Sequence, residues 1–410
     1  MLYIDDITLI LGTAVLLLAL LSPFVNVLLF RIKSEHCGSP ASSPDAADSP
    51  QADSPMERRS SPGISVVITV DDEGESLKAN LPKWLSQSYE GDYQVIVVVA
   101  GNDSLVENVL KQNSGSERLY TTFIPSSSRY MSRKKLAVTI GVKAAKYDWV
   151  LLTDADCCPS TDNYVCNVAG KCSDGCRLIL GYTNYGEGMS AARLFDSTYS
   201  LYRQLAMAER GRAWAYSGKS LLFDKRMFID GKGFDGNLKY ARGEYEYIVN
   251  KFASDTNVSL SVDTGSMVTE EPLTDRGWTN KCLNYMAIRK TLKRSKLPRA
   301  LFNMSMASMI AANLAAVGIA AYSLLAQRWI LAGCSVLALI LAGIIRTVLL
   351  NRCLRPYLEG MSLLHMWWLE QTLPLRNAIR MAKYRLADKY DFIHCPKRSM
   401  ALESMLIASP

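Results

Sequence analysis

Three long apolar runs without a charged residue constrain this 410-residue chain more than any other feature. They cover residues 7–30, 305–326 and 329–345. As a helix rising about 1.5 Å per residue, the first run is long enough to cross a hydrocarbon core of roughly 30 Å. The other two runs are separated only by Gln327 and Arg328, which predicts a helical hairpin. We therefore expect one N-terminal transmembrane helix and a C-terminal transmembrane hairpin.

Basic residues predict the orientation of these spans. Arg31 and Lys33 follow the first run, whereas Asp5 and Asp6 precede it, which argues against a cleaved signal peptide because such peptides begin with basic residues. The hairpin is flanked by Lys290, Lys293, Arg294, Lys296 and Arg299 before it and by Arg346, Arg352 and Arg355 after it. The positive-inside rule then predicts a multi-pass protein of the cell (inner) membrane, with residues 31–304 and the C-terminal tail in the cytoplasm.

Composition divides the remaining chain. Residues 34–62 are rich in Ser, Pro, Ala and Asp and lack a recurring apolar residue, which is typical of a disordered linker. The tail mixes Trp and Leu with Arg and Lys, so it either lies along the inner leaflet or packs as a helix against the middle domain. The predicted order is an anchor at 1–33, the linker, a folded domain at 63–300, the hairpin at 301–352 and a basic amphipathic tail at 353–410.

Charge and histidine content exclude several classes of function. Lys and Arg exceed Asp and Glu by 46 to 39, and the surplus lies beside the apolar runs, so we expect membrane lipids and no nucleic acid as partners. The chain has only His36, His365 and His394. Because none of them lies in the middle domain, that domain has no Ser/His/Asp triad, His-ligated zinc site or histidine base.

The middle domain begins with alternating strand and helix patterns. Short β-branched runs at 64–70, 94–100, 120–124 and 149–153 predict strands, and a Lys-rich helix is predicted at 133–146. Alternation of this kind predicts an α/β fold with a mostly parallel, Rossmann-like sheet.

Acidic residues follow three of the predicted strands. They are Asp71, Asp72 and Glu73 after the first, Asp103 after the second, and Asp154 and Asp156 after the fourth. Since the carboxyl ends of parallel strands form the ligand-binding edge of such sheets, these side chains are expected to converge there. Two carboxylates spaced i and i+2 can hold one divalent cation, Mg²⁺ or Mn²⁺. Lys134 and Lys135, at the start of the basic helix, are placed to meet a diphosphate.

Two glutamates open a helix farther along. Glu244 and Glu246 follow Gly243 at the start of a helical pattern. With no histidine in the domain, deprotonation of an acceptor hydroxyl falls to a carboxylate, and these two are the candidates. The alternative interpretation is a favourable interaction of either carboxylate with the helix dipole.

Several short motifs follow one another between residues 63 and 299. They are ISVVITV at 64–70, WLSQSY at 84–89, KLAVTIG at 135–141, LLTDADC at 151–157, Gly233-Phe234 and Gly243-Glu244. In combination they resemble the family 2 glycosyltransferases, inverting enzymes of GT-A fold that move a sugar from a nucleotide donor. Membrane-anchored bacterial members of that family, which serve cell-envelope glycan biosynthesis, look similar in their spans. The resemblance implies a nucleotide-sugar half at 63–156 and an acceptor half at 157–300.

The resemblance also implies roles for individual residues. Asp154 and Asp156 match the metal-binding Asp-x-Asp, with Asp156 the direct ligand of Mn²⁺ or Mg²⁺. Asp72, Glu73, Asp103, Lys134, Lys135 and Asp154 would bind the donor, and Glu244 or Glu246 would be the base. A lipid-linked or otherwise membrane-presented glycan is the implied acceptor.

The chain departs from that family at three places. Val99-Ala100 stand where the family has an acidic pair, and Tyr245 replaces the second residue of its Glu-Asp motif. Residues 278–285 lack the Gln/Arg-x-x-Arg-Trp motif of processive synthases, which favours transfer of one sugar per encounter. The first two departures favour an alternative, a catalytically impaired scaffold or partner subunit. A nucleotidyltransferase is a third interpretation.

Overall fold

The computed structural model of the protein describes residues 5–26, 31–32, 61–71, 73–101, 103–124, 132–173 and 175–387. The chain divides into two compact units. Of the described residues, the sheet unit contains those from 61 to 189, from 208 to 292 and residue 387, and the helical unit those from 5 to 32, from 190 to 207 and from 293 to 386. The linker predicted at 34–62 lies, except for its last two residues, outside the described residues.

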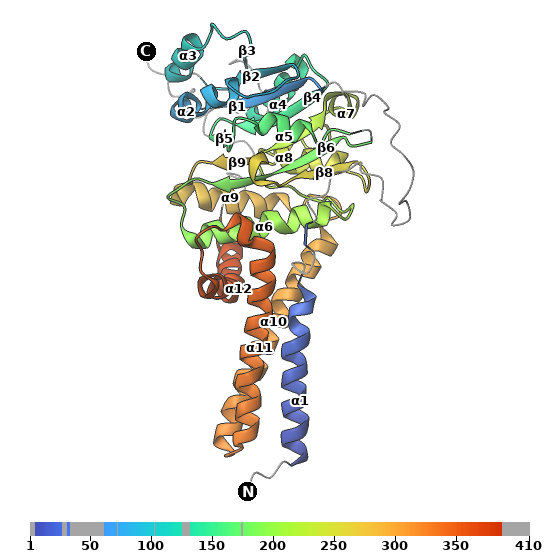
Figure 1. Ribbon diagram of the computed structural model, residues 1–410, viewed down its shortest axis with the longest axis vertical. Helices are drawn as coiled ribbons and strands as arrows, with labels where there is room; N and C mark the ends of the chain where they lie inside the picture. Colours follow the sequence, from blue (N-terminus) through green and yellow to red (C-terminus); the bar gives the residue numbers. More distant parts are fainter. Residues whose placement is uncertain are drawn as a thin grey trace, which may run out of the picture. The chain divides into compact units, whose positions relative to one another are not determined.

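Four parallel strands form the first half of the sheet unit (Figure 1). They are β1 (Ile64–Val70), β2 (Tyr93–Val99), β3 (Leu119–Phe123) and β4 (Trp149–Asp154), in the spatial order β3-β2-β1-β4. Helices α2 (Gly74–Leu85), α3 (Ser104–Gln112) and α4 (Arg133–Ala144) connect them. The strands predicted from sequence are confirmed to within about one residue. Because the chain builds outward from β1 and then returns to β4 on the other side, the strand order reverses between β1 and β4, where sheets of this kind bind ligands.

The second half makes the sheet mixed rather than mostly parallel. β7 (Leu221–Asp224) is antiparallel to β4, and β6 (Leu178–Tyr185) is antiparallel to β7. β8 (Val258–Ser261) and β9 (Met267–Glu270) are parallel to β6, and β5 (Cys157–Pro159) is antiparallel to β9. The helices here are α5 (Tyr164–Ala169), α7 (Lys225–Asp230), α8 (Glu244–Phe252) and α9 (Asp275–Ile288). The pairing of Cys157 with Glu270 brings the end of β9 beside the Asp-x-Asp segment.

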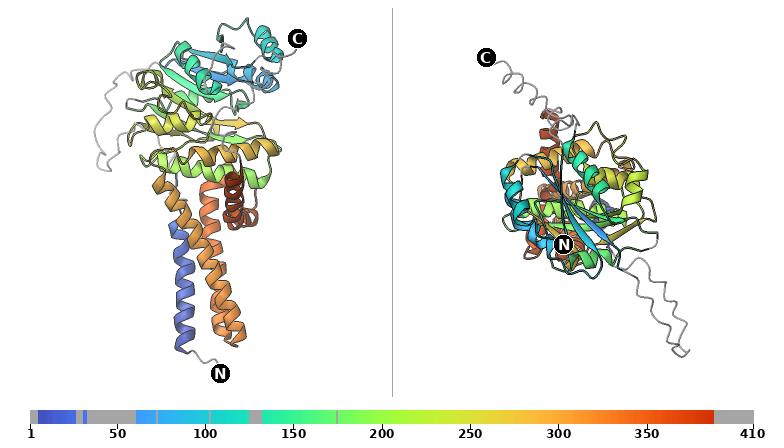
Figure 2. Two further views of the ribbon diagram at one scale, coloured as in Figure 1. Left: turned by 180° about the vertical axis from the view of Figure 1, so that it is seen from behind. Right: turned by 90° about the horizontal axis from the view of Figure 1, so that it is seen from above.

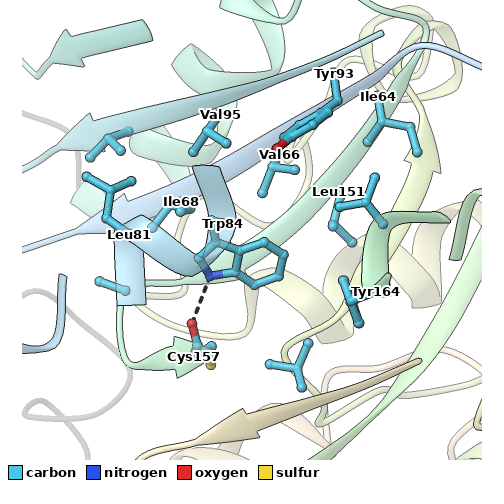
Figure 3. Packing of buried hydrophobic residues seen from close by; sticks show 14 of the residues in the cluster. Ile64, Val66, Ile68, Leu81, Trp84, Tyr93, Val95, Leu151, Cys157 and Tyr164 are labelled. Carbon is cyan, nitrogen blue, oxygen red and sulfur yellow. Dashed lines mark hydrogen bonds between the residues drawn. The ribbon is translucent and has the colours of Figure 1, made fainter. Parts of the chain in front are cut away.

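The core beneath the parallel strands holds that segment in place. Trp84 of α2 is buried, and its indole nitrogen donates to the carbonyl oxygen of Cys157 at 2.9 Å (Figure 3). Its ring meets Tyr164 edge-on, with centroids 5.4 Å apart. The apolar stripe of α2 therefore fixes the backbone that follows Asp156.

The helical unit contains the three predicted spans. They are Asp6–Val25, Lys296–Leu325 and Trp329–Tyr357, each long and apolar enough to cross a membrane. The spans correspond to α1 (Asp6–Leu21) with η1 (Ser22–Val25), α10 (Lys296–Leu325), and α11 (Trp329–Leu354) with η4 (Arg355–Tyr357). α1, α10 and α11 pack side by side (left view of Figure 2).

Two further helices belong to the helical unit. α6 (Ala191–Ala208) comes from the middle of the predicted catalytic domain, and α12 (Leu363–Leu386) forms the described part of the tail. Arg376 of α12 pairs with Asp196 of α6 at 2.6 Å, and Arg380 pairs with the same carboxylate. α12 thus packs within this unit through one face and exposes an apolar row of Leu364, Trp368, Leu375 and Ile379.

A buried ion pair links α11 and α12. Arg346 is 1% exposed and Glu370 is fully buried, and their closest atoms lie 3.1 Å apart. Arg346 also donates to the carbonyl oxygen of Ser22. Because a charge buried without its partner keeps its desolvation cost, neither residue is dispensable alone.

We expect Arg346→Met to lower the stability of the protein by about 3–5 kcal/mol, because it leaves the carboxylate of Glu370 buried without a cation. The double variant Arg346→Met with Glu370→Leu removes both charges and should recover most of that loss. Thermal unfolding of the detergent-purified chain measures both. A double variant no more stable than the single one would contradict the ion-pair explanation.

Candidate active site

Asp154 is the last residue of β4 and lies beside β1. Its carboxylate is buried, at 3% exposure for the residue. The parallel register pairs Asp154 with Thr69, and the Thr69 hydroxyl donates to Asp154 Oδ1 at 3.2 Å. The reversal of strand order between β1 and β4 therefore places an acidic group where the sequence predicted one.

Three further donors converge on the same carboxylate. Lys134 of α4 lies 2.6 Å from Asp154 Oδ2, and Lys219 pairs with the same oxygen. The hydroxyl of Tyr245, in the first turn of α8, donates to Oδ1 at 3.0 Å. Burial alone would raise the pKa of Asp154, but Lys134 and Lys219 outweigh burial and hold that pKa well below its usual range. With Thr69, these contacts give each oxygen of Asp154 two donors.

Lys219 is held by its backbone as well as by its charge. It lies two residues before β7, and its amide donates to the Thr183 hydroxyl at 2.8 Å. The neighbouring Ser220 is fixed by the buried Tyr216, whose hydroxyl donates to the Ser220 carbonyl oxygen at 2.6 Å. The Lys219 ammonium lies 5.0 Å from the centroid of the Tyr245 ring. Burial would lower the pKa of Lys219, but Asp154, Glu270 and Asp156 together raise it.

Asp156 lies beside a second buried acid. Glu270 ends β9 and is 3% exposed, and Lys281 of α9 donates to its two oxygens at 2.9 and 2.7 Å. The amide of Glu271 donates to the carbonyl oxygen of Asp156 at 2.9 Å, which fixes the two segments together. Burial, with the negative charges of Glu270 and Asp154, raises the pKa of Asp156 to about 6. Asp156 is thus an acid without a close cation of its own among the described side chains.

These donors bear on the divalent ion predicted at Asp154 and Asp156. The two oxygens of Asp154 already accept four hydrogen bonds, and two of these bonds come from ammonium groups. Glu270 is paired with Lys281. A carboxylate has about four lone-pair positions, so Asp154 has none left for a metal. Among the described residues, no group of three or more His, Cys, Asp or Glu could hold an ion. In this arrangement Asp154 and Glu270 are engaged by lysines, which leaves Asp156 as the one carboxylate of the predicted pair without a close cation among the described residues, and a single carboxylate does not make a divalent-cation site.

The two candidate bases lie at the start of α8. Gly243 caps the helix with a φ of 100°, a left-handed conformation that favours glycine. Glu244 is 4% exposed, and its Oε1 has no hydrogen-bond partner among the described residues. Glu246 is half-buried, and burial raises its pKa to about 7. A carboxylate with such a pKa is suited to accept a proton near neutral pH.

Lys135 faces these glutamates rather than Asp154. Its ammonium donates to the carbonyl oxygens of Asn237 and Tyr240 at 2.8 and 2.5 Å, and it lies 4.7 Å from the centroid of the Tyr247 ring. Burial lowers the pKa of Lys135 to about 8, although Glu244 and Glu246 act in the opposite direction. Lys135 therefore secures the chain segment that leads into α8.

The remaining predicted donor residues lie at the ends of β1 and β2. Asp72 falls outside the described residues. Glu73 is exposed at the start of α2 and accepts a hydrogen bond from the amide of Asp71. Asp103 caps α3 by accepting from the amide of Leu105 at 2.8 Å. A Cβ on Gly74 would lie 2.6 Å from Asp103 Oδ2, so the glycine allows the two strand ends to approach closely.

Comparison of the sequence with known families identifies the class of enzyme. The model of glycosyl transferase family 21 matches residues 45–387. The chain belongs to this family. Its mixed α/β sheet is consistent with a GT-A-like fold. Family 21 membership confirms the prediction of a glycosyltransferase, whereas the assignment to family 2 is not confirmed.

Two solved structures resemble this family 21 chain at low identity. The mannosyltransferase PcManGT from Pyrobaculum calidifontis, in complex with GDP-Man and Mn²⁺, is 15% identical with a TM-score of 0.48, over 83% of this chain and 97% of that one. GalNAc-T7 with UDP, GalNAc and Mn²⁺ is 14% identical with a TM-score of 0.39, over 52% and 44%. A comparison with curated proteins gave no match.

Sequence reasoning missed three residues of the site and misread a fourth. Lys219, Glu270 and Lys281 carry no motif, and they reach the site from segments 65 or more residues beyond Asp154. In the sequence Tyr245 stands out only as a departure from a family pattern, yet its hydroxyl donates to Asp154. The apolar strand before Glu270 was the one local signal available.

We expect opposite effects from neutralising the two aspartates. Asp154→Asn leaves two ammonium groups without a carboxylate and should lower stability by about 3 kcal/mol. Asp156→Asn removes repulsion from Glu270 and should raise the unfolding midpoint at pH 8. The pKa of Asp156 in the folded chain is raised to about 6. The contribution of this carboxyl group to the free energy of unfolding is therefore fully present below the pKa that it has in the unfolded chain, and it is lost as the pH rises through 6. Thermal unfolding of both variants at pH 5 and pH 8 checks this, and a destabilised Asp156→Asn at pH 8 would contradict it.

Proposed function

We propose that this family 21 chain is an inverting, non-processive enzyme of hexosyltransferase type, which moves a sugar from a nucleotide-sugar donor to a membrane-associated acceptor. The observation that carries the proposal is the buried carboxylate of Asp154 with Lys134 at the reversal of strand order. That position is where sheets of this kind bind nucleotides. Glu73, Asp103 and the undescribed Asp72 are proposed to line the nucleotide pocket at the neighbouring strand ends.

The chemistry needs one base and one stabilised leaving group. The acceptor oxygen attacks the anomeric carbon as the bond from that carbon to the diphosphate oxygen breaks, and in-line attack inverts the centre. We propose that Glu246 accepts the proton of the acceptor hydroxyl, because its pKa is raised to near neutral pH. Glu244 is the alternative base. Lys134 offers positive charge to the departing nucleoside diphosphate. The predicted Mn²⁺ or Mg²⁺ has no part in these steps, because the donors around Asp154 do not fit it.

A membrane-presented acceptor, such as a lipid-linked glycan, is supported by the course of the chain. The chain passes between the sheet unit and the helical unit near residues 189, 207 and 292. The acceptor half is therefore covalently joined at three points to a unit whose three helices can span a membrane. The basic residues around the spans support a cytoplasmic sheet unit in the inner membrane.

The test is release of nucleoside diphosphate by the detergent-purified chain from a panel of nucleotide sugars, with a membrane lipid extract as acceptor. Release together with label in extractable lipid supports the proposal. Label found only in soluble sugar would contradict the membrane acceptor. The alternative, a scaffold or partner subunit, is favoured by Val99-Ala100 and by Tyr245, whose hydroxyl is already engaged by Asp154. Folded protein that releases no diphosphate from any donor would support that alternative.

The pH dependence identifies the base. Because deprotonated Glu246 accepts the proton and its pKa is raised to about 7, activity should rise tenfold per pH unit below 7 and level off above it. Glu246→Gln should lower the rate about 100-fold or more. Glu244→Gln is the matched control, because Glu244 lies in the same first turn of α8. If Glu244→Gln abolishes the rate and Glu246→Gln keeps the pH profile, the base is Glu244.

A further inference from the structure

We propose that the ammonium groups of Lys219 and Lys134 take the place of a divalent metal, so that the chain binds the donor diphosphate without a metal ion. This inference rests on the proposed function and specifies how the donor is held. It starts from the disagreement between the Asp-x-Asp motif, which predicts a metal, and the donors that surround Asp154.

The first argument is that lysines already occupy the carboxylates that a metal would use. Lys134, Lys219 and Lys281 lie among the carboxylates of Asp154, Asp156 and Glu270, and the charge of Glu73 also acts on Lys134 and Lys219. In a metal site of this kind, uncompensated carboxylates bind the cation. Here Asp154 and Glu270 are already paired with lysines, so a divalent ion bound to Asp154 would have to displace Lys134 and Lys219 from that carboxylate.

The second argument is that Lys219 is built into the site. The Thr183 hydroxyl and the buried Tyr216 fix the backbone on either side of its Cα, as described above. Ser220 is fixed again through its own amide, which donates to the Tyr216 hydroxyl at 3.2 Å. With its backbone fixed and its side chain largely covered, the ammonium of Lys219 stays beside Asp154. It is a permanent positive charge of the site.

The third argument is that both ammonium groups keep donors for a ligand. A lysine ammonium has three N–H donors. Within the described residues, the hydrogen bonds of Lys134 and Lys219 side chains go to Asp154 alone. Each side chain also keeps some exposure, 23% for Lys134 and 18% for Lys219. Their remaining N–H groups can therefore donate to phosphate oxygens, and their charge stabilises the negative charge that builds on the leaving diphosphate.

The test is calorimetric binding of UDP, GDP, ADP and CDP to the full-length, detergent-purified chain, once with EDTA and once with Mn²⁺. We expect at least one of the four to bind in EDTA, with Mn²⁺ changing its Kd less than about threefold. Lys219→Met should weaken that binding about tenfold or more in EDTA. The same variant exposes Asp154 and Asp156 to a cation and should gain Mn²⁺ binding, measured by Mn²⁺ electron paramagnetic resonance.

Two variants control for damage to the fold. Lys171 is another largely buried lysine, and it pairs with Asp263 at 3.2 Å rather than with any of these carboxylates. The variant Lys171→Met should therefore bind nucleotide as the unaltered chain does. Lys219→Arg keeps the charge and should keep most of the metal-free binding. Thermal unfolding of each variant reports whether it is folded.

The outcomes separate this inference from the proposed function. Nucleotide binding by the unaltered chain that requires Mn²⁺ overturns the inference and leaves the glycosyltransferase proposal standing. Metal-free binding that Lys219→Met leaves intact also overturns it. The absence of nucleotide binding in both conditions overturns the inference and the proposed function together. Metal-free binding that falls in Lys219→Met and persists in Lys219→Arg and Lys171→Met supports it.

Discussion

The burial of one carboxylate, that of Asp154, shapes the centre of the sheet unit. A charge removed from water is costly unless it is paired and hydrogen-bonded. Asp154 meets this requirement through Thr69 of β1, Lys134 of α4, Lys219 before β7 and Tyr245 of α8. Four segments that are far apart in sequence thus share one electrostatic contact. The start of α8, with both candidate bases, is positioned by the same contact because Tyr245 lies between them.

The same constraint organises the helical unit. Its apolar helices pack through small and aliphatic side chains such as Val15, Ala19, Ala316 and Ala338, which give little directional preference. Charged contacts supply direction, since Arg346 meets Glu370 and two arginines of α12 meet Asp196 of α6. α6 is thereby bound to helices encoded more than a hundred residues away, although its sequence lies within the predicted catalytic domain.

Much of the fold could be predicted because its signals are local. The strands β1 to β4 and the three apolar spans follow from the character of adjacent residues, which the chain carries whatever its tertiary structure. The convergence of Lys134 and Asp154 was also predictable, because each stands at the end of an element that borders the binding edge. Asp103 and Lys135 show the limit of such reasoning. Both lie in the predicted segments, but one caps α3 and the other binds the carbonyl groups before α8.

The sequence by itself determined the three long apolar helices, the parallel strands and the presence of two aspartates at the end of β4. Only the tertiary structure decided what surrounds those aspartates. Lys219 and Glu270 reach them through β7 and β9, which join the sheet beyond β4 in an order that no local pattern specifies. The physical reason is that a carboxylate's capacity to bind a metal depends on how many of its lone pairs are already used. That number is set by long-range partners, and the motif Asp-Ala-Asp does not encode them.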